Sequence, residues 1–128
     1  MAKQIITSEK VAKPRVPLSP AVKIGNLVFV SGCTPFTVDY QIAKGDFAAQ
    51  MHQVMHGLMS LLDSAGSSLD KVVKVNVFLA RIRDFPEMNE IYKTYFKEGN
   101  YPARTTVEAT MTNKDFLLEI ECVAEVAG

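Results

Sequence analysis

The chain has 128 residues, 48% of them hydrophobic, which suits a single domain over residues 1–128 with an apolar core. Its 14 basic and 14 acidic residues balance, so no basic excess is available to attract nucleic acid or anionic lipid. No stretch approaches the roughly 18 apolar residues of a membrane span, and the N-terminus lacks the apolar segment of a signal peptide. We therefore expect a cytoplasmic protein without nucleic-acid or membrane partners.

The N-terminal part of the chain predicts an irregular arm followed by a β-hairpin. Residues 9–20 contain three prolines, and proline lacks an amide donor and fixes φ, so this segment is an extended arm or an edge strand. The turn dipeptide Gly25-Asn26 separates two apolar runs and predicts the hairpin. The expected order is a short strand at 3–6, the arm, strands at 21–24 and 27–32, and a loop at 33–45.

Two amphipathic helices are predicted from apolar residues that recur at spacings of three and four. Asp46 can cap the first helix by accepting from free backbone amides, and Gly66 suits the left-handed residue after its end. Asp84 begins the second helix, with Glu87 three residues on in a capping-box pattern, and Gly99 closes it. The apolar stripes are Phe47, Met51, Val54, Met55, Leu58 and Leu62 in the first helix, and Met88, Ile91, Tyr92, Tyr95 and Phe96 in the second.

Three further strands follow from runs of apolar and β-branched residues. Residues 72–79 form a strand between the two helices. Segments 104–109 and 117–124, joined by a turn at 112–115, form the last two strands. The order β-β-α-β-α-β-β predicts an α+β fold, in which a mixed β-sheet carries both helices on one face.

Alternation along the last two strands predicts which side chains face the helices. One set is apolar and is expected to pack against the helices: Val107, Leu118, Ile120 and Cys122. The other set is expected to share the opposite face: Arg104, Thr106, Glu108, Glu119 and Glu121.

The face away from the helices is not simply polar. In the strand at 72–79, Val75 and Val77 alternate with Val72 and Phe78, so both faces carry large apolar side chains. A sheet that is apolar on both faces needs a cover on both. Because only two helices are available, we expect another subunit to cover the second face.

Arg104 and Glu119 are the candidates for chemistry. Arg104 opens a strand, and its guanidinium offers a rigid fork of donors that matches a carboxylate. Glu119 lies between Leu118 and Ile120, where a carboxylate must be paired, hydrogen-bonded or functional. Partial desolvation would raise the pKa of Glu119 and make it a candidate acid or base.

A purely structural interpretation of these two residues stands beside the functional one, and the pattern alone favours it. Arg104 would then pair with Glu108, Glu121 or Asp115 to neutralise the sheet face. Glu119 would likewise be satisfied by a neighbouring Lys or Arg.

Other reactive residue types form no recognised constellation. His52 and His56 lie one helical turn apart, but no third metal ligand and no HExxH motif accompany them, so we interpret them as surface residues. Cys33 and Cys122 form no CxxC or metal-ligand pattern, and reduced, partly buried thiols are the prediction, with a disulfide or a reactive thiol as the alternative. Asn89 borders the stripe of the second helix, where a structural hydrogen bond is the default interpretation.

Motifs spread over nearly the whole chain match those of one known family. They are Ile24-Gly25-Asn26, Val30-Ser31-Gly32, Gln50, Ala65-Gly66, Val72 to Leu79, Asp84-Phe85, Asn89, Tyr92 to Phe96, Tyr101-Pro102-Ala103-Arg104 and Leu118-Glu119-Ile120-Glu121. In order, spacing and length they resemble the Rid family, also called the YjgF/YER057c/UK114 family. The resemblance implies a fold like that of the small trimeric chorismate mutases and a homotrimer with clefts between subunits.

The resemblance also implies an activity, the hydrolytic deamination of reactive imines and enamines such as 2-iminopropanoate and 2-iminobutanoate. The products are 2-keto acids and ammonia, and no metal or organic cofactor is needed. Arg104 matches the family arginine that binds the substrate carboxylate, and Glu119 matches the glutamate thought to orient or activate water and move protons. The backbone near Ser31, Gly32 and Thr106 would line the cleft.

The arm departs from the family pattern. Leu18 stands where the archetypal branch has Tyr, and Pro20 where it has Gln, so a less polar pocket wall is expected. We count Leu18 and Asn89 with the substrate-binding residues. The alternatives are a deaminase of a different enamine, such as an aminomuconate-type intermediate, and a trimer that binds small carboxylates without turnover. The endoribonuclease or translation-inhibitor role described for some relatives is disfavoured by the neutral charge.

Overall fold

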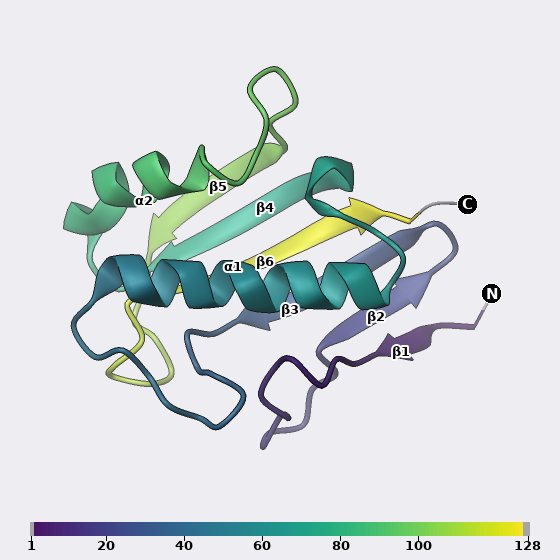
Figure 1. Cartoon of the computed structure of the whole chain (residues 1–128), viewed down its shortest axis with the longest axis horizontal. Coiled ribbons are helices and arrows are strands. Elements are labelled where there is room, and N and C mark those ends of the chain that lie inside the picture. Colours follow the sequence, from purple (N-terminus) through teal and green to yellow (C-terminus); the bar gives the residue numbers. More distant parts are fainter. Residues whose placement is uncertain (1, 127–128) are drawn as a thin grey trace.

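In the computed structural model, which describes residues 2–126, a six-stranded sheet carries two helices on one face (Figure 1). The α+β class and the mixed sheet are confirmed, because β4 and β5 pair in parallel while the other neighbours pair antiparallel, in the order β1-β2-β3-β6-β4-β5. The strands are β1 (Gln4–Ile6), β2 (Ala21–Ile24), β3 (Leu27–Cys33), β4 (Val72–Leu79), β5 (Ala103–Glu108) and β6 (Leu118–Glu125), and the helices are α1 (Phe47–Ser64) and α2 (Phe85–Tyr92).

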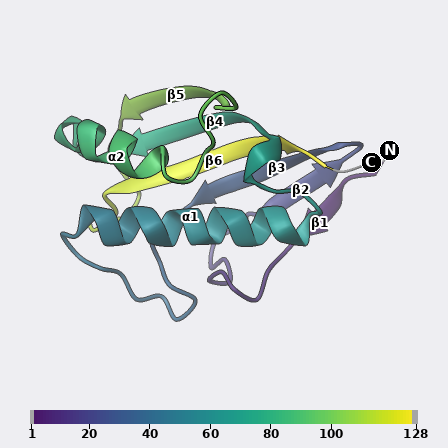
Figure 2. The same cartoon turned by 45° about the horizontal axis from the view of Figure 1, so that its top comes forward.

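Helix α1 lies along β3 and β6 and supplies much of the core (Figure 2). The Asp46 side chain accepts from the Ala49 amide at 3.0 Å, and Gly66 has φ +81°, so both predicted ends are confirmed. All six residues of the predicted apolar stripe are buried. Among the described residues, no helix combines the length and the hydropathy needed to cross a membrane.

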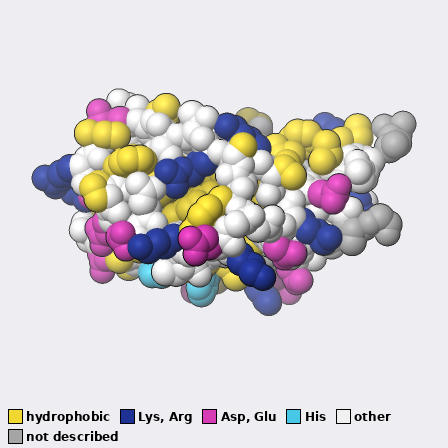
Figure 3. Space-filling model, turned by 90° about the horizontal axis from the view of Figure 1, so that it is seen from above, with side chains coloured by type: hydrophobic (Ala, Val, Ile, Leu, Met, Phe, Trp, Pro, Cys, Tyr) yellow, Lys and Arg dark blue, Asp and Glu magenta, His cyan; other side chains and the backbone are white. Residues whose placement is uncertain are grey.

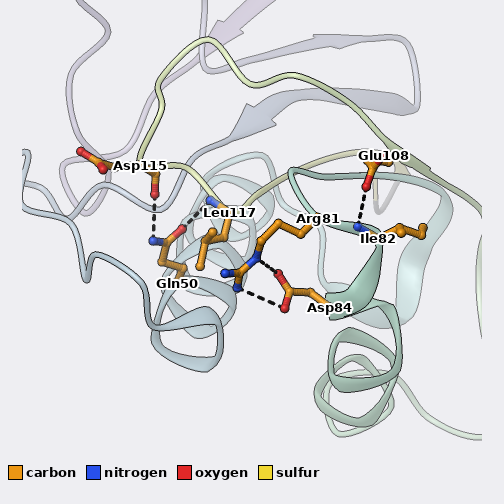
Figure 4. Close-up of polar contacts among 7 residues, drawn as sticks. All are labelled: Gln50, Arg81, Ile82, Asp84, Glu108, Asp115 and Leu117. Atoms are coloured by element: carbon orange, nitrogen blue, oxygen red, sulfur yellow. Dashed lines mark hydrogen bonds and ion pairs between the residues drawn. The ribbon is translucent and has the colours of Figure 1, made fainter.

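Helix α2 is shorter than predicted and starts differently. It ends at Tyr92, although Phe96 beyond it is still buried. The capping box is wrong, because the Asp84 carboxylate makes no cap and instead accepts from the Arg81 guanidinium at 2.8 and 3.2 Å (Figure 4). This partly buried ion pair fixes the short 3-10 turn η2 (Ile82–Asp84) that precedes α2. Asp84 thus holds the start of the helix through its bonds to Arg81 and not by capping a backbone amide.

The buried Gln50 side chain ties two loops to α1 (Figure 4). Its amide nitrogen donates to the carbonyls of Ala43 and Asp115, both at 3.0 Å, and its carbonyl oxygen accepts from the Leu117 amide at 2.8 Å. A fully buried amide with all these partners satisfied holds a fixed geometry. Gln50 therefore fixes the position of Leu117, which directly precedes β6 and lies two residues before Glu119.

The sheet face opposite the helices lacks a cover within residues 2–126 and carries exposed apolar side chains. Phe29 and Val107 are 45% and 42% exposed there, and Phe78 is half-buried between its partners Glu119 and Val107. Val72 does not belong to this face as predicted, because the register of β4 shifts between Val72 and Lys74 and returns Val72 to the core. The remaining apolar surface keeps the prediction of a covering subunit open.

Candidate functional site

A cavity of about 650 Å³ lies where the N-terminal arm, the end of β3 and α1 meet the loops before α1 and before β6. In Figure 1 the arm between β1 and β2 and the loop between β3 and α1 lie below α1 in the view. The size falls in the usual range for small-molecule sites. Of the residues predicted to bind substrate or to catalyse, the cavity is lined by Leu18, Ser31, Gly32 and Glu119.

Glu119 is a half-buried carboxylate that makes no hydrogen bond or ion pair within the described part of the chain. It projects from β6 onto the open face of the sheet, opposite Phe78. Burial, and to a smaller extent the negative charge of Glu121, raises the pKa of Glu119 above the ordinary carboxyl value. The structural interpretation, in which a Lys or Arg neutralises Glu119, is therefore wrong for the described chain.

Gly32 leaves room for this carboxylate. A Cβ atom added to Gly32 would overlap Glu119 Oε2 and crowd the carboxyl carbon at 2.8 Å. Beside it, the Ser31 hydroxyl donates to the Ser19 carbonyl at 2.6 Å and the Ser31 amide donates to the Pro20 carbonyl at 3.0 Å. Ser31 thus fastens the arm to β3, while Gly32 admits the Glu119 side chain.

We expect Gly32→Ala to lower the thermal midpoint by an amount equivalent to about 1–3 kcal/mol, because the new methyl group must displace the Glu119 carboxylate. Calorimetry or circular dichroism measures this shift. The same substitution in a Glu119→Ala background should lose most of its effect, since the clashing group is gone. An equal penalty in both backgrounds would show that Gly32 matters for a reason other than Glu119.

Arg104 lies on the other side of the sheet, beside α2. Its guanidinium carbon is 4.8 Å from the ring centre of Tyr92 and 5.9 Å from that of Phe85, a cation–π arrangement. Arg104 is half-buried and makes no salt bridge or side-chain hydrogen bond within residues 2–126. Its fork of donors is therefore available to an anion.

The carboxylates that could have neutralised Arg104 are engaged elsewhere. Glu108 accepts from the Ile82 amide at 2.7 Å (Figure 4), and Glu121 accepts from the Asn76 amide group at 3.3 Å. Asp115 lies 3.9 Å from the Lys44 ammonium. The structural interpretation of Arg104, which required one of Glu108, Glu121 and Asp115, is wrong.

Two further polar groups near Arg104 have no partner. The hydroxyl oxygens of Tyr92 and Thr106 are buried without a hydrogen bond among the described residues. Burial raises the pKa of Tyr92 to about 12, so the phenol stays protonated and remains a donor. Asn89 lies on α2 between Phe85 and Tyr92, at spacings that place all three on one helix face. Figure 3 views the β5 side of the molecule and shows hydrophobic side chains gathered between basic and acidic ones.

Arg104 and Glu119 do not share a face, so the sequence-based prediction is wrong on this point. Strand β5 pairs with β4 so that Arg104 lies beside Val75 and Thr106 beside Val77, and both valines face the helices. Val107, predicted to face the helices, lies on the open face instead. The reason is that β5 is an edge strand, where the helix layer ends and polar side chains are tolerated on the inner face.

The remaining candidates have structural roles. The ring of His52 hydrogen-bonds the Tyr95 hydroxyl, and His56 is exposed. Cys33 and Cys122 are free and buried, which confirms reduced thiols, and burial raises the pKa of both, that of Cys122 to about 12. Thiols of this kind are unreactive. Among the described residues, no group of three or more His, Cys, Asp or Glu could hold a metal ion.

Sequence reasoning missed the aromatic residues around the site. Tyr92 belongs to the predicted apolar stripe of the second helix and Phe85 does not, yet both rings flank Arg104. The arm residue Arg15 was also missed, and its guanidinium carbon lies 3.4 Å from the ring centre of Tyr40 at the cavity. The spacing of Phe85, Asn89 and Tyr92 on one helix face was the available signal, but no pattern in the sequence shows that β5 faces it.

The fold and site together define a class of small α+β proteins with a ligand-sized cavity next to Glu119. Within residues 2–126 one sheet face has no cover, and an arginine without a salt bridge lies on the other face. The family model described as Endoribonuclease L-PSP matches residues 8–126. The chain belongs to this family, which is the Rid (YjgF/RutC) family, so the resemblance found in the sequence is confirmed.

Individual relatives agree with this assignment. The chain is 44% identical over 125 residues to a RutC family protein of Pyrococcus abyssi, covering 97% of this chain and 98% of the relative. It is 38% identical over 127 residues to the 3-aminoacrylate deaminase RutC of Acinetobacter baylyi, covering 98% and 100%. The crystal structure of the yeast protein YEO7 superposes with a TM-score of 0.93 at 34% identity, covering 98% of this chain and 100% of that one.

Proposed function

We propose that this protein is a hydrolytic deaminase of imines or enamines that bear a carboxylate, and that it works without a metal or organic cofactor. One observation carries the proposal: Arg104 and Glu119 are both half-buried and both unpaired within residues 2–126. A half-buried charged group without a protein partner marks a candidate contact for a ligand or another chain. The relative named as a 3-aminoacrylate deaminase supports the same chemistry.

In this proposal the Arg104 guanidinium binds the substrate carboxylate through two parallel hydrogen bonds. The rings of Tyr92 and Phe85 hold the guanidinium in place. Glu119 orients a water molecule and takes its proton as the oxygen bonds to the imine carbon, while the C=N electron pair moves to nitrogen. The carboxyl group of Glu119 then returns the proton to nitrogen, which gives a carbinolamine. Glu119 next takes the hydroxyl proton of the carbinolamine and delivers it to the amine nitrogen. As the C=O bond forms, the C–N bond breaks with its electron pair moving to nitrogen, ammonia leaves, and the 2-keto acid remains.

The opposite placement of Arg104 and Glu119 supports a site that is completed between subunits. A second chain that covers the open sheet face, where Phe29 and Val107 are exposed, would lie next to Glu119 and the cavity. If that chain presents the α2–β5 side, its Arg104 meets Glu119 of the first chain. Repeating this unlike contact around a closed ring of three chains would give the homotrimer that the family resemblance implies, with three equivalent sites.

Mixing two inactive variants tests the proposal directly. Arg104→Ala and Glu119→Gln are co-expressed with different tags, and keto acid release is measured with 2-iminobutanoate generated in situ. We expect each variant alone to be nearly inactive, while mixed trimers recover roughly a quarter of the native sites, because an intact Arg104 then meets an intact Glu119.

Three outcomes would contradict parts of the proposal. No recovery on mixing, with active wild type, would place Arg104 and Glu119 of one chain in the same site. Wild-type activity in either single variant would remove that residue from the mechanism. Binding of 2-ketobutanoate that depends on Arg104, without turnover by the wild type, would indicate a carboxylate-binding protein instead of a deaminase.

A further inference from the structure

We propose that the preferred substrate of this site carries a bulky apolar side chain, which occupies the cavity beyond Glu119. The inference rests on the proposed deaminase function and specifies the substrate class. It would assign the site to imines related to branched, thioether or aromatic amino acids rather than to those with a methyl or ethyl group. Its basis is the extent, the lining and the charge distribution of the cavity.

The extent of the cavity exceeds what a small imine needs. The cavity begins at Glu119 and Gly32 and reaches α1 on the other side of the end of β3, where Gln53, Gly57 and Leu61 line it. Its volume is about 650 Å³. Since sites of roughly 300–1,000 Å³ enclose drug-sized ligands, a methyl or ethyl side chain would leave most of this space empty. A substrate that reacts at Glu119 has room for a long side chain towards α1.

The lining of the cavity is largely apolar, and part of it is aromatic. The arm contributes Val11, Val16 and Leu18, and the loops contribute Phe36 and Phe116. The two phenylalanine rings pack edge to face with centres 5.0 Å apart. Phe36 also packs against Tyr40 at 5.5 Å, and Arg15 of the arm stacks on that Tyr40 ring. These contacts join the arm to the loop, so an apolar wall exists before any ligand binds.

The positions of the basic side chains indicate that the cavity holds the side chain of the substrate and not its carboxylate. Arg104, the proposed carboxylate ligand, does not line the cavity. Lys13 and Arg15 are the cations that do, and the Arg15 guanidinium is already stacked on Tyr40. Both are exposed, as expected for residues at the mouth. The substrate carboxylate therefore binds outside the cavity, and the imine carbon lies at Glu119. The side chain of the substrate occupies the apolar cavity.

A substrate series tests the inference. An amino-acid oxidase generates imines in situ from alanine, 2-aminobutyrate, leucine, methionine, phenylalanine and glutamate, and kcat/KM for their hydrolysis is measured. We expect the leucine, methionine and phenylalanine imines to exceed the alanine imine by roughly tenfold or more, because each buried methylene group adds to discrimination in a hydrophobic pocket. The glutamate imine, with a second carboxylate, should be among the poorest substrates.

A plug variant locates the effect in the cavity. A Cβ atom at Gly57 would meet only Val11 Cγ1, at 3.6 Å, so the backbone of α1 accepts a side chain here, and Gly57→Leu also improves helix propensity. We expect Gly57→Leu to lower the ratio of kcat/KM for the phenylalanine imine to that for the alanine imine by roughly tenfold. The matched control, Gly57→Ala, adds one methyl group and should change this ratio much less.

The outcomes separate the two proposals. If no imine of the series is hydrolysed, the deaminase function fails and the substrate preference falls with it. If the alanine or 2-aminobutyrate imine is the best substrate, the deaminase function stands and the present inference is overturned. A best rate with the glutamate imine, sensitive to Lys13→Ala, would overturn it in favour of a dicarboxylate site. An unchanged ratio in folded Gly57→Leu would show that the side chain does not reach α1.

Discussion

Replacing Arg104 by alanine should lower kcat/KM for 2-iminobutanoate by roughly 10²–10⁴-fold, because each hydrogen bond to a charged group contributes about 1.5–3 kcal/mol and the guanidinium fork offers two. Arg104→Lys keeps the charge without the fork and should give an intermediate loss. Steady-state kinetics with keto acid detection measures both. The thermal midpoint should fall only slightly, since Arg104 has no salt bridge to lose within residues 2–126 and loses only its contacts with the Tyr92 and Phe85 rings.

A matched control and a rescue sharpen the result for Arg104. Arg83 is an exposed arginine that lies just before α2, so Arg83→Ala should leave kcat/KM near the wild-type value. Added guanidinium ion should restore part of the activity of Arg104→Ala, because the alanine leaves a space beside the Tyr92 ring. If Arg104→Ala and Arg83→Ala behave alike, Arg104 does not bind the substrate carboxylate.

The order of the elements could be predicted because each has its own local signal. The Asp46 cap, the stripe along α1 and the turn dipeptide Gly25-Asn26 are short-range features, and the structure has the helix and the hairpin where they predict them. Caps, apolar stripes and turn residues each describe a single helix, strand or turn. They do not indicate which strands are neighbours in the sheet, so the parallel pairing of β4 with β5 could not be predicted from them.

The orientation of β5 explains why the alternation of apolar and polar residues mispredicts the face on which Arg104 lies. Alternation assumes that the apolar set of a strand faces the core, which holds for β6, where Leu118, Ile120 and Cys122 are buried. At the sheet edge the rule reverses, because Arg104 on the inner face of β5 lies against Phe85 and Tyr92 of α2, while Val107 lies on the open face. An apolar residue on the open face is what a contact with another chain would bury.

The start of α2 was mispredicted for a different reason. Asp84 and Glu87 satisfy the sequence pattern of a capping box, but Arg81 lies three residues earlier and captures the Asp84 carboxylate. A buried charge is better satisfied by a guanidinium than by a single amide. The consequence reaches the site, because this ion pair holds the turn that places Phe85 beside Arg104.

Glu119→Gln should lower kcat/KM by roughly 10²–10⁴-fold, the usual contribution of a positioned acid–base group. The wild type should show an acidic limb, with activity falling as the pH decreases through the pKa of Glu119, which burial places above the ordinary carboxyl value. Glu121→Gln should move this limb to lower pH, because it removes the neighbouring negative charge that also raises the pKa of Glu119. Profiles of kcat/KM against pH measure both effects.

Stability should respond to Glu119→Gln in the opposite direction from activity. Because the folded state raises the pKa of Glu119, it binds the carboxyl proton more tightly than the unfolded state, and stability falls as the pH rises through this titration. Glu119→Gln should therefore raise the thermal midpoint at neutral pH. The gain should vanish below the ordinary carboxyl pKa, where the group is protonated in both states. Glu125→Gln, a substitution of an exposed residue on the same strand, should change neither the activity nor the thermal midpoint. A stable, inactive Glu119→Gln protein marks a carboxylate kept for chemistry, whereas a destabilised one would mark a structural residue.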